Sequence, residues 1–264
     1  MLKNHFDTVI IAECSQGQRK YGVEFGGEYI CKYLDITPTI TLEQKIFNDI
    51  NDEKENGYKI LSFMLKSFHE NNKKTLVIGG DHSLGISSVD YLANLYGDKL
   101  SVLWIDAHAD INDHITSLSG NLHGMPLGYH HISRTDTPLW RKNNQYRLKS
   151  DQLYYFGIRD LDPSEKKLID DEKIGFSMKF DDSIKKFIEK AEILLISFDV
   201  DALDPSYLDS TGCYAPGGLI PEDVKDVINY ARTLNKLTHL DLMEFNPHIG
   251  NWIKSLECIK KILC

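Results

Sequence analysis

The sequence predicts an α/β fold, a three-layer α/β/α sandwich in which helices cover both faces of a mostly parallel sheet. Short apolar runs alternate with longer segments of helical spacing along all 264 residues. Such alternation implies crossover connections and therefore parallel strands. The runs are apolar at consecutive positions, as in a sheet buried on both faces. No linker, repeat or low-complexity tract divides the chain, so we expect one domain spanning residues 1–264.

Six short apolar runs are expected to be strands. In chain order they cover residues 8–11, 75–78, 100–105, 153–158, 193–198 and 238–243. Each is short and is followed by a polar or glycine-containing segment, as strand ends are.

Seven segments with apolar residues at helical spacing are expected to be helices. They cover residues 41–51, 58–70, 86–95, 164–171, 182–190, 221–234 and 249–263. Pro163 and Pro221 stand where the first turn of a helix accepts proline. Asp181 and Asp182 are candidate N-caps for the helix that follows them. The polar segments 71–74 and 142–145 are expected to be loops.

Composition excludes several classes of protein. Hydrophobic residues make up 42% and charged residues 26%, as is usual for a soluble globular chain. A net charge of -9 argues against nonspecific binding to nucleic acid or to anionic membranes. No signal peptide or membrane-spanning run is recognisable. The five cysteines form no CxxC pair, which favours reduced thiols in the cytoplasm.

Metal-ligand side chains follow three of the predicted strands. Ligands of open parallel sheets bind at the carboxyl ends of strands, and residues two apart on an extended segment share a face. The residues concerned are His82, then Asp106, His108 and Asp110, then Asp199 and Asp201. Four carboxylates with two imidazoles and no thiol suit two divalent ions, manganese before zinc. Two such ions can activate one shared water near neutral pH. The alternative is that the Asp-x-Asp pairs only cap turns or belong to a calcium loop. Calcium prefers oxygen ligands, so His82 and His108 argue against it.

The chain resembles the ureohydrolases, the family of binuclear manganese amidinohydrolases that includes arginases and agmatinases. The resemblance runs from Gly17 to about Gly250 and is carried by GGDHS (79–83), DAHADIN (106–112) and SFDVDALDPS (197–206). It implies an α/β/α sandwich around an eight-stranded parallel sheet, two Mn²⁺ per subunit, and a trimer or hexamer. The implied ligands are His82, Asp106, Asp110 and Asp199 for one ion, and Asp106, His108, Asp199 and Asp201 for the other.

The segment SGNLHG (119–124) resembles the arginase version of this loop. Arginine carries an α-carboxylate that agmatine lacks, so an arginase needs additional neutral donors. By resemblance, Asn112, Ser117, Ser119 and Asn121 are expected to supply them, and His123 is expected to shuttle a proton to the leaving amine. A Ser-Gly-Asn sequence alone is usually a turn.

Residues 157–165 also resemble arginases. The resemblance implies that Asp162 binds the α-ammonium group of the substrate, with Asp160 and Glu165 acting through water. The alternative is an acidic helix start that favours the helix dipole. Glu244 is expected to pair with the planar guanidinium group, and Asp110 to steer the nucleophile or relay its proton.

One loop departs from the family pattern. Cys213 stands where the family has a hydroxyl residue that helps position the guanidinium group, and Tyr214 replaces a proline. A thiol is a weaker donor and a larger atom, which leaves open an altered substrate or neutral drift. Seven other histidines lack motif support and are expected to be structural or on the surface: His5, His69, His114, His130, His131, His239 and His248.

The function expected from these features is hydrolysis of L-arginine to L-ornithine and urea by a hydroxide that bridges two metal ions. The nearest alternatives are agmatinase or another guanidino or formimidoyl ureohydrolase. A slow, guanidino-binding homologue is an alternative of another class, supported only by the loop with Cys213. A deacetylase of the same fold is disfavoured because that group uses one zinc ion and fewer ligands.

Overall fold

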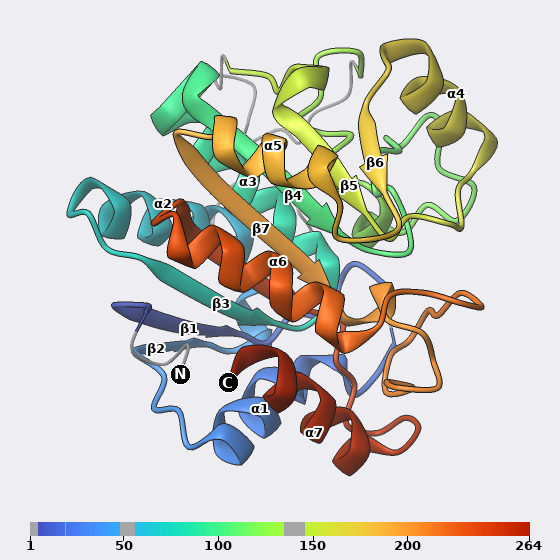
Figure 1. Ribbon diagram of the computed structural model, residues 1–264. Helices are drawn as coiled ribbons and strands as arrows, with labels where there is room; N and C mark the ends of the chain where they lie inside the picture. Colours follow the sequence, from blue (N-terminus) through green and yellow to red (C-terminus); the bar gives the residue numbers. More distant parts are fainter. Residues whose placement is uncertain (1–4, 19, 48–55, 135–145) are drawn as a thin grey trace.

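The computed structural model describes residues 5–18, 20–47, 56–134 and 146–264. Its centre is an eight-stranded sheet in the order β2-β1-β3-β8-β7-β4-β5-β6 (Figure 1). Every pair of neighbouring strands is parallel. The strands are β1 (Thr8–Ala12), β2 (Ile40–Leu42), β3 (Thr75–Gly79), β4 (Leu100–Ile105), β5 (Leu153–Phe156), β6 (Gly175–Ser177), β7 (Ile193–Asp199) and β8 (Leu237–Met243).

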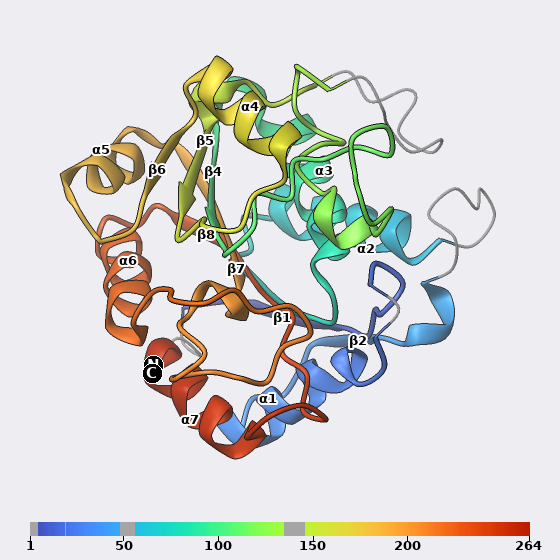
Figure 2. The same ribbon diagram turned by 90° about the vertical axis from the view of Figure 1, so that its right-hand side faces the viewer.

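Helices cover both faces of this sheet. They are α1 (Gly26–Leu34), α2 (Gly57–Glu70), α3 (Gly85–Tyr96), α4 (Pro163–Glu172), α5 (Asp182–Lys190), α6 (Pro221–Thr233) and α7 (Trp252–Leu263). One buried cluster joins one face of the sheet to α1, α5, α6 and α7, and a second joins the opposite face to α2, α3 and α4. Figure 2 shows α2 and α3 on one side of the sheet and α5 and α6 on the other. The predicted three-layer sandwich with a parallel sheet is confirmed.

The two faces of the sheet follow from the alternation of side chains along each strand. In β1, Ile10 belongs to one buried cluster and Ile11 to the other. In β4, Val102 and Leu103 divide in the same way. Successive strand residues point to opposite faces, so strands apolar at every position are required where helices cover both sides.

Several predicted helix starts are confirmed. Pro163 and Pro221 are the first residues of α4 and α6. The side chain of Asp181 accepts hydrogen bonds from the backbone amides of Ser183 and Ile184 and so caps α5. Asp182, the other candidate, lies inside that helix. The loop predicted at 71–74 connects α2 to β3, whereas the one at 142–145 lies outside the described residues.

The helix predicted over residues 41–51 is wrong. Residues Ile40–Leu42 form β2, and Gln44–Ile46 form a single 3₁₀ turn; residues 48–51 lie outside the described part. β2 pairs in register with β1, for example Ile10 with Ile40. Backbone groups of β2 form hydrogen bonds with β1 instead of the helical bonds predicted for this segment. Pairing within the sheet thus outweighs local helix propensity.

Three elements have no counterpart among the predicted segments. The edge strands β2 and β6 are only three residues long. Helix α1, for which no segment was predicted, begins with two glycines. The structure explains them, because a Cβ atom at Gly26 would lie 2.2 Å from the carbonyl oxygen of Phe245. The glycine lets α1 approach the segment that follows β8.

The sheet order places the carboxyl ends of β3, β8, β7, β4 and β5 next to one another along one edge. Each of these five strands runs directly into one of the motif-bearing segments. Among the described residues, no helix has the length and apolar character needed to cross a membrane.

Candidate active site

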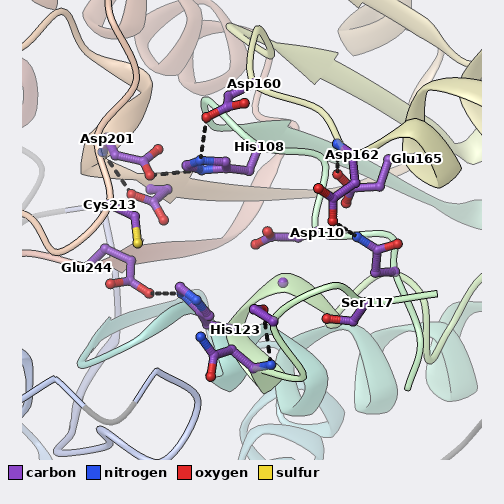
Figure 3. Close-up of a pocket in the computed structure, with 15 residues that line it drawn as sticks. His108, Asp110, Ser117, His123, Asp160, Asp162, Glu165, Asp201, Cys213 and Glu244 are labelled. Atoms are coloured by element: carbon purple, nitrogen blue, oxygen red, sulfur yellow. Dashed lines mark hydrogen bonds and ion pairs between the residues drawn. The ribbon is translucent and has the colours of Figure 1, made fainter. Parts of the chain in front are cut away.

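A cleft of about 240 Å³ opens at this edge of the sheet (Figure 3). Its walls come from the segments that follow β4, β5, β7 and β8 and from the loop around residues 117–124. The lining residues are His108, Asp110, Asn112, Ser117, Ser119, Asn121, His123, Gly124, Asp160, Asp162, Glu165, Asp199, Asp201, Cys213 and Glu244. All the predicted site residues except His82 and Asp106 are therefore on the cleft wall.

Those two residues lie beneath the cleft and are buried. The Nδ1 atom of His82 is 3.0 Å from Asp106 Oδ2, 3.3 Å from Asp110 Oδ2 and 3.2 Å from Asp199 Oδ2. The ring of His82 stacks on Trp104 with centroids 4.2 Å apart. One imidazole nitrogen therefore points at three carboxylates.

A second group lies beside the first. His108 Nδ1 is 3.0 Å from Asp201 Oδ2 and 3.5 Å from Asp106 Oδ1. Two sets of candidate metal ligands result, one of His82, Asp106 and Asp199, the other of Asp106, His108 and Asp201. The two oxygens of Asp106 face different sets, so this carboxylate can connect two ions.

The electrostatics of these groups favour cations. Burial, reinforced by the negative charge of Asp201, raises the pKa of Asp199 well above its usual range. Burial and the charge of Asp106 do the same to Asp110. Burial disfavours a charged His82, yet its contacts with Asp106 outweigh burial and raise its pKa to about 9. Mutually repelling carboxylates of this kind are stabilised by nearby positive charge.

The donor set fits divalent metal ions. His82 Nδ1 is buried, makes no hydrogen bond of good geometry and faces three carboxylate oxygens, as expected of a nitrogen that binds a metal. Its surroundings are carboxylate oxygens, and together they form the mixed oxygen and imidazole set that Mn²⁺ accepts. We infer that His82, Asp106, His108, Asp110, Asp199 and Asp201 are the residues able to hold two ions.

Two site residues have a backbone conformation that L-residues rarely adopt. Asp110 has φ 50° and Glu244 has φ 68°. The other described non-glycine residues with positive φ, such as Asp35 and Lys173, end helices or lie in turns. Strained φ values persist where the surrounding structure fixes them, and they concentrate at functional sites.

Glu244 is held by three groups from distant parts of the chain. Its Oε1 accepts the backbone N–H of His82 at 2.8 Å and lies 3.2 Å from His123 Nδ1. Its Oε2 accepts a hydrogen bond from the side chain of Gln18. Burial opposes charging of His123, but the bond to Glu244 and its charge outweigh burial and raise the pKa of His123.

The opposite wall combines an amide and carboxylates. Asn112 Nδ2 donates to Asp162 Oδ2 at 3.0 Å. Glu165 accepts the backbone N–H groups of Ile111 at 3.2 Å and Asp162 at 3.0 Å. Burial raises the pKa of Glu165 to about 7 in spite of these bonds. Glu165 thus ties the start of α4 to the segment after β4, and Asp160 lies outside it, 67% exposed.

Ser117, Ser119 and Asn121, which we call the rim residues together with Asn112, also stabilise the loop around residues 117–124. Ser117 Oγ accepts the backbone N–H of Gly120, and Ser119 Oγ accepts that of Asn121. The turn role and the cleft-lining position therefore coexist in Ser117, Ser119 and Asn121.

The loop with Cys213 is fixed from two sides. Lys20 Nζ donates to the carbonyl of Gly212 and lies 3.5 Å from Cys213 Sγ. The guanidinium group of Arg159 donates to carbonyl oxygens of both this loop and the segment after β7: Asp201, Ala202, Leu203, Ala215 and Pro216. Arg159 therefore connects the walls formed after β5 and β7.

Three residues that touch the site have no role in the predicted motifs. Trp104 stacks on His82 and donates from Nε1 to Asp106 Oδ2 at 3.0 Å. Ser197 contacts His82, and Gln18 contacts Glu244. Spacing could have indicated two of them, because Trp104 and Ser197 stand two residues before Asp106 and Asp199 and so share their faces. Nothing in the sequence pairs Gln18 with Glu244.

The comparisons with known proteins agree with this geometry. A model described as "Arginase family" matches residues 7–262. The chain belongs to the arginase family. It is 34% identical to an arginase of Staphylococcus aureus, over 89% of this chain and 88% of that protein. The motif resemblance is confirmed, and as a family member the chain is a ureohydrolase, an enzyme acting on C–N bonds.

Solved structures of arginases share the fold of this chain. The crystal structure of the Bacillus subtilis arginase aligns with a TM-score of 0.82 at 26% identity, covering 97% of each chain. The Entamoeba histolytica arginase, crystallised in complex with L-ornithine, aligns with a TM-score of 0.81 at 24% identity and the same coverage.

Proposed function

We propose that this enzyme hydrolyses the guanidinium group of L-arginine to give L-ornithine and urea, with two Mn²⁺ ions per subunit. The observation that carries the proposal is the two-ended cleft. Its floor holds the carboxylate and imidazole groups, and its opposite wall holds Asn112, Ser119 and Asp162. An amino acid with a guanidinium tail offers matching groups at both ends.

The floor would hold the ions as two overlapping ligand sets. His82, Asp106, Asp110 and Asp199 would bind one, and Asp106, His108, Asp199 and Asp201 the other. When bound, two Mn²⁺ ions would supply Lewis acidity and a water activated near neutral pH. Asp110 would orient that water, because its carboxylate lines the cleft and also lies 3.3 Å from His82 Nδ1.

Glu244 and His123 would act on the guanidinium group. A planar cation pairs with a carboxylate in its own plane, and Glu244 is a buried carboxylate fixed by His82 and Gln18. The raised pKa of His123 favours its protonated form at neutral pH. A protonated imidazole on the cleft wall can donate to the amine of ornithine as the C–N bond breaks.

The rim residues would bind the amino-acid end. Asn112, Ser117, Ser119 and Asn121 would donate to the α-carboxylate. Asp162 would bind the α-ammonium group, with Asp160 and Glu165 acting through water. Such neutral donors distinguish arginine from agmatine because agmatine has no carboxylate. The ornithine complex of the Entamoeba relative supports this choice of substrate class.

Cys213 supports a second candidate, a ureohydrolase for another guanidino compound or a slow guanidino-binding homologue. The thiol lines the cleft wall, where a weak donor would bind arginine poorly.

The deciding experiment measures urea release by Mn²⁺-loaded protein with L-arginine and agmatine side by side. Chelated protein and an Asp199→Ala variant serve as controls. A strong preference for arginine supports the proposal. A preference for agmatine, or no urea from either substrate while two Mn²⁺ are bound, would contradict it.

The proposal includes a cytoplasmic setting and a homo-oligomer. All five cysteines lie in the described part of the chain and none forms a disulfide, which suits a reducing compartment. A trimer or hexamer is the expected assembly, and light scattering of the Mn²⁺-loaded protein tests it.

A further inference from the structure

A row of buried polar side chains leads from His82 away from the cleft. His82 Nε2 lies 2.9 Å from Ser197 Oγ, on the side opposite the carboxylates. Ser197 Oγ donates to Asp241 Oδ2 at 3.1 Å. Ser197 and Asp241 are register partners on β7 and β8, and neither is exposed.

The row continues to a second buried histidine. Asp241 Oδ1 accepts from Ser88 Oγ at 2.9 Å and lies 2.7 Å from His239 Nε2. His239 Nδ1 is 2.8 Å from Tyr91 OH and 2.5 Å from Thr75 Oγ1. We call His82, Ser197, Asp241 and His239 the histidine relay.

Hydrogen-bond directions around Asp241 fix the proton on His82. An ionised carboxylate only accepts, and Asp241 is surrounded by the hydroxyls of Ser88 and Ser197 and by His239 Nε2–H. Ser197 has one hydroxyl proton and donates it to Asp241. The oxygen of Ser197 therefore accepts a hydrogen bond from the Nε2–H group of His82. The lone pair of His82 is left on Nδ1, the atom that faces the metal ligands.

The reverse arrangement would disable the site. A protonated Asp241 would donate to Ser197, and Ser197 would donate to His82 Nε2. The proton of His82 would then sit on Nδ1, where it would block coordination. The arrangement in which Asp241 only accepts is therefore the one compatible with a bound ion, and each donor to Asp241 favours that arrangement.

The far end of the relay favours His239 as a donor. Burial lowers the pKa of His69 to about 3, so this histidine is neutral. Tyr96 OH lies 3.3 Å from His69 Nδ1 and can donate to it, which leaves the single proton of the neutral ring on Nε2. His69 Nε2 lies 3.1 Å from Thr75 Oγ1 and can donate to that oxygen. The hydroxyl proton of Thr75 can then be donated to His239 Nδ1. That leaves the proton of His239 on Nε2, pointing at Asp241.

We propose that His239 is a positioning residue for the metal centre: it donates to Asp241, which accepts from Ser197, and this hydrogen-bond row holds His82 in its coordinating tautomer. The inference rests on the proposed function in that it requires a divalent ion at His82. Carboxylates behind metal-binding histidines commonly set ring orientation and ligand basicity, and their loss costs about 10- to 100-fold in metal affinity. In this chain the carboxylate of Asp241 acts on His82 through Ser197, and His239 of β8 donates to that carboxylate.

The test measures Mn²⁺ affinity and stoichiometry of the full chain by competition with a fluorescent chelator. His239→Leu removes the donor and should weaken the ion bound by His82 by about 10- to 100-fold, while the ion bound by His108 and Asp201 is retained. His239→Gln should restore binding to within a few-fold, because its amide can donate to Asp241 and accept from Tyr91. Tyr91→Phe is a milder variant and should weaken the same ion only slightly.

The matched control is His131→Leu. His131 is equally buried, but its partners are Ser150 and the backbone amide of Ser133, outside the relay. It should leave both affinities unchanged. Thermal unfolding of the chelated variants establishes that each is folded.

The outcomes separate this inference from the proposed function. Two ions bound equally tightly by wild type and His239→Leu would overturn the positioning role alone. Equal weakening of both ions, or weakening by His131→Leu as well, would show a general loss of structure and also overturn it. A wild-type protein that binds no Mn²⁺ would overturn the proposed function together with the relay.

Discussion

The imidazole of His123 lies on the cleft wall with 18% of its side chain exposed, and one hydrogen bond to Glu244 orients it. It belongs to neither set of candidate metal ligands. Its proposed role, delivering a proton to the leaving amine, can therefore be separated experimentally from metal binding. The role of Cys213 can also be tested separately from metal binding, because this residue lines the cleft without belonging to either set.

Replacing His123 by Ala should lower kcat for L-arginine by about 10²- to 10⁴-fold, the usual contribution of a positioned general acid. Manganese content should stay at the wild-type value because no ligand is removed. Steady-state urea assays with metal analysis of the same samples measure both quantities. His114→Ala, at an exposed histidine of the same segment, is the control and should retain full activity. A His123→Ala variant with the wild-type kcat would contradict the proposed role of His123 in proton transfer.

Replacing Cys213 by Thr should raise kcat/KM for L-arginine about fivefold. A hydroxyl is a stronger donor than a thiol, and one additional hydrogen bond contributes about 1 kcal/mol. The assay compares wild type, Cys213→Thr and Cys213→Ala, with Ala as the variant that has no donor. If Thr and Ala are equally slow, the thiol itself takes part in binding, and a guanidino substrate other than arginine becomes the better assignment.

At the scale of elements, the short edge strands show where sequence patterns stop being informative. β3, β4 and β7 are largely apolar on both faces because helices cover them, and their runs are recognisable in the sequence. The run of β8 is recognisable as well, although one of its faces carries His239 and Asp241. β2 and β6 have three residues each and partly exposed positions, so partners in the sheet define them rather than their own composition. Helix α1 was not predicted, and its first residue, Gly26, is required by a close approach to Phe245, more than 200 residues away.

The N-cap of α5 is a prediction at this scale. Asp181 accepts two backbone N–H groups of the helix, at 2.9 Å from Ser183 and 3.2 Å from Ile184. It also accepts a bond from Ser177 in β6 at 3.0 Å. Asp181→Ala should lower the free energy of unfolding by about 1 to 2 kcal/mol, measured by urea denaturation. Lys186→Ala, an exposed site in the middle of α5, should change it by less than about 0.5 kcal/mol. Equal losses of unfolding free energy in the two variants would mean that the Asp181 cap does not stabilise α5.

For the whole molecule, the sheet order explains why so much of the candidate site could be predicted. Five adjacent strands bring their carboxyl ends together, and each predicted ligand lies within a few residues of one of these ends. Contacts between distant segments could not be predicted. Gln18 meets Glu244 across 226 residues, and His239 reaches Asp241, Thr75 and Tyr91 only because β8 packs beside β3 and beneath α3. Such contacts depend on the packed fold and leave no local pattern.

Acid stability is a property of the whole fold to which the buried His131 contributes. Its ring accepts the backbone N–H of Ser133 and lies 3.2 Å from Ser150 Oγ. Burial, assisted by Arg134, lowers the pKa of His131 from 6.5 to about 4. Because the folded protein binds this proton less readily than the unfolded chain, the contribution is complete above pH 6.5 and is lost as the pH falls toward 4. It amounts to roughly 3 kcal/mol in total.

His131→Gln removes this titration and should flatten the fall of the unfolding free energy below pH 6.5 by up to about 1.4 kcal/mol per pH unit. Urea denaturation between pH 4 and pH 8, with chelator present throughout, isolates the effect from metal release. The carboxylates of the cleft titrate in wild type and variant alike, so the difference between the two curves belongs to His131. A His131→Gln curve parallel to wild type would show that folding does not lower the pKa of this histidine, in which case another buried group, such as His69, causes the acid transition.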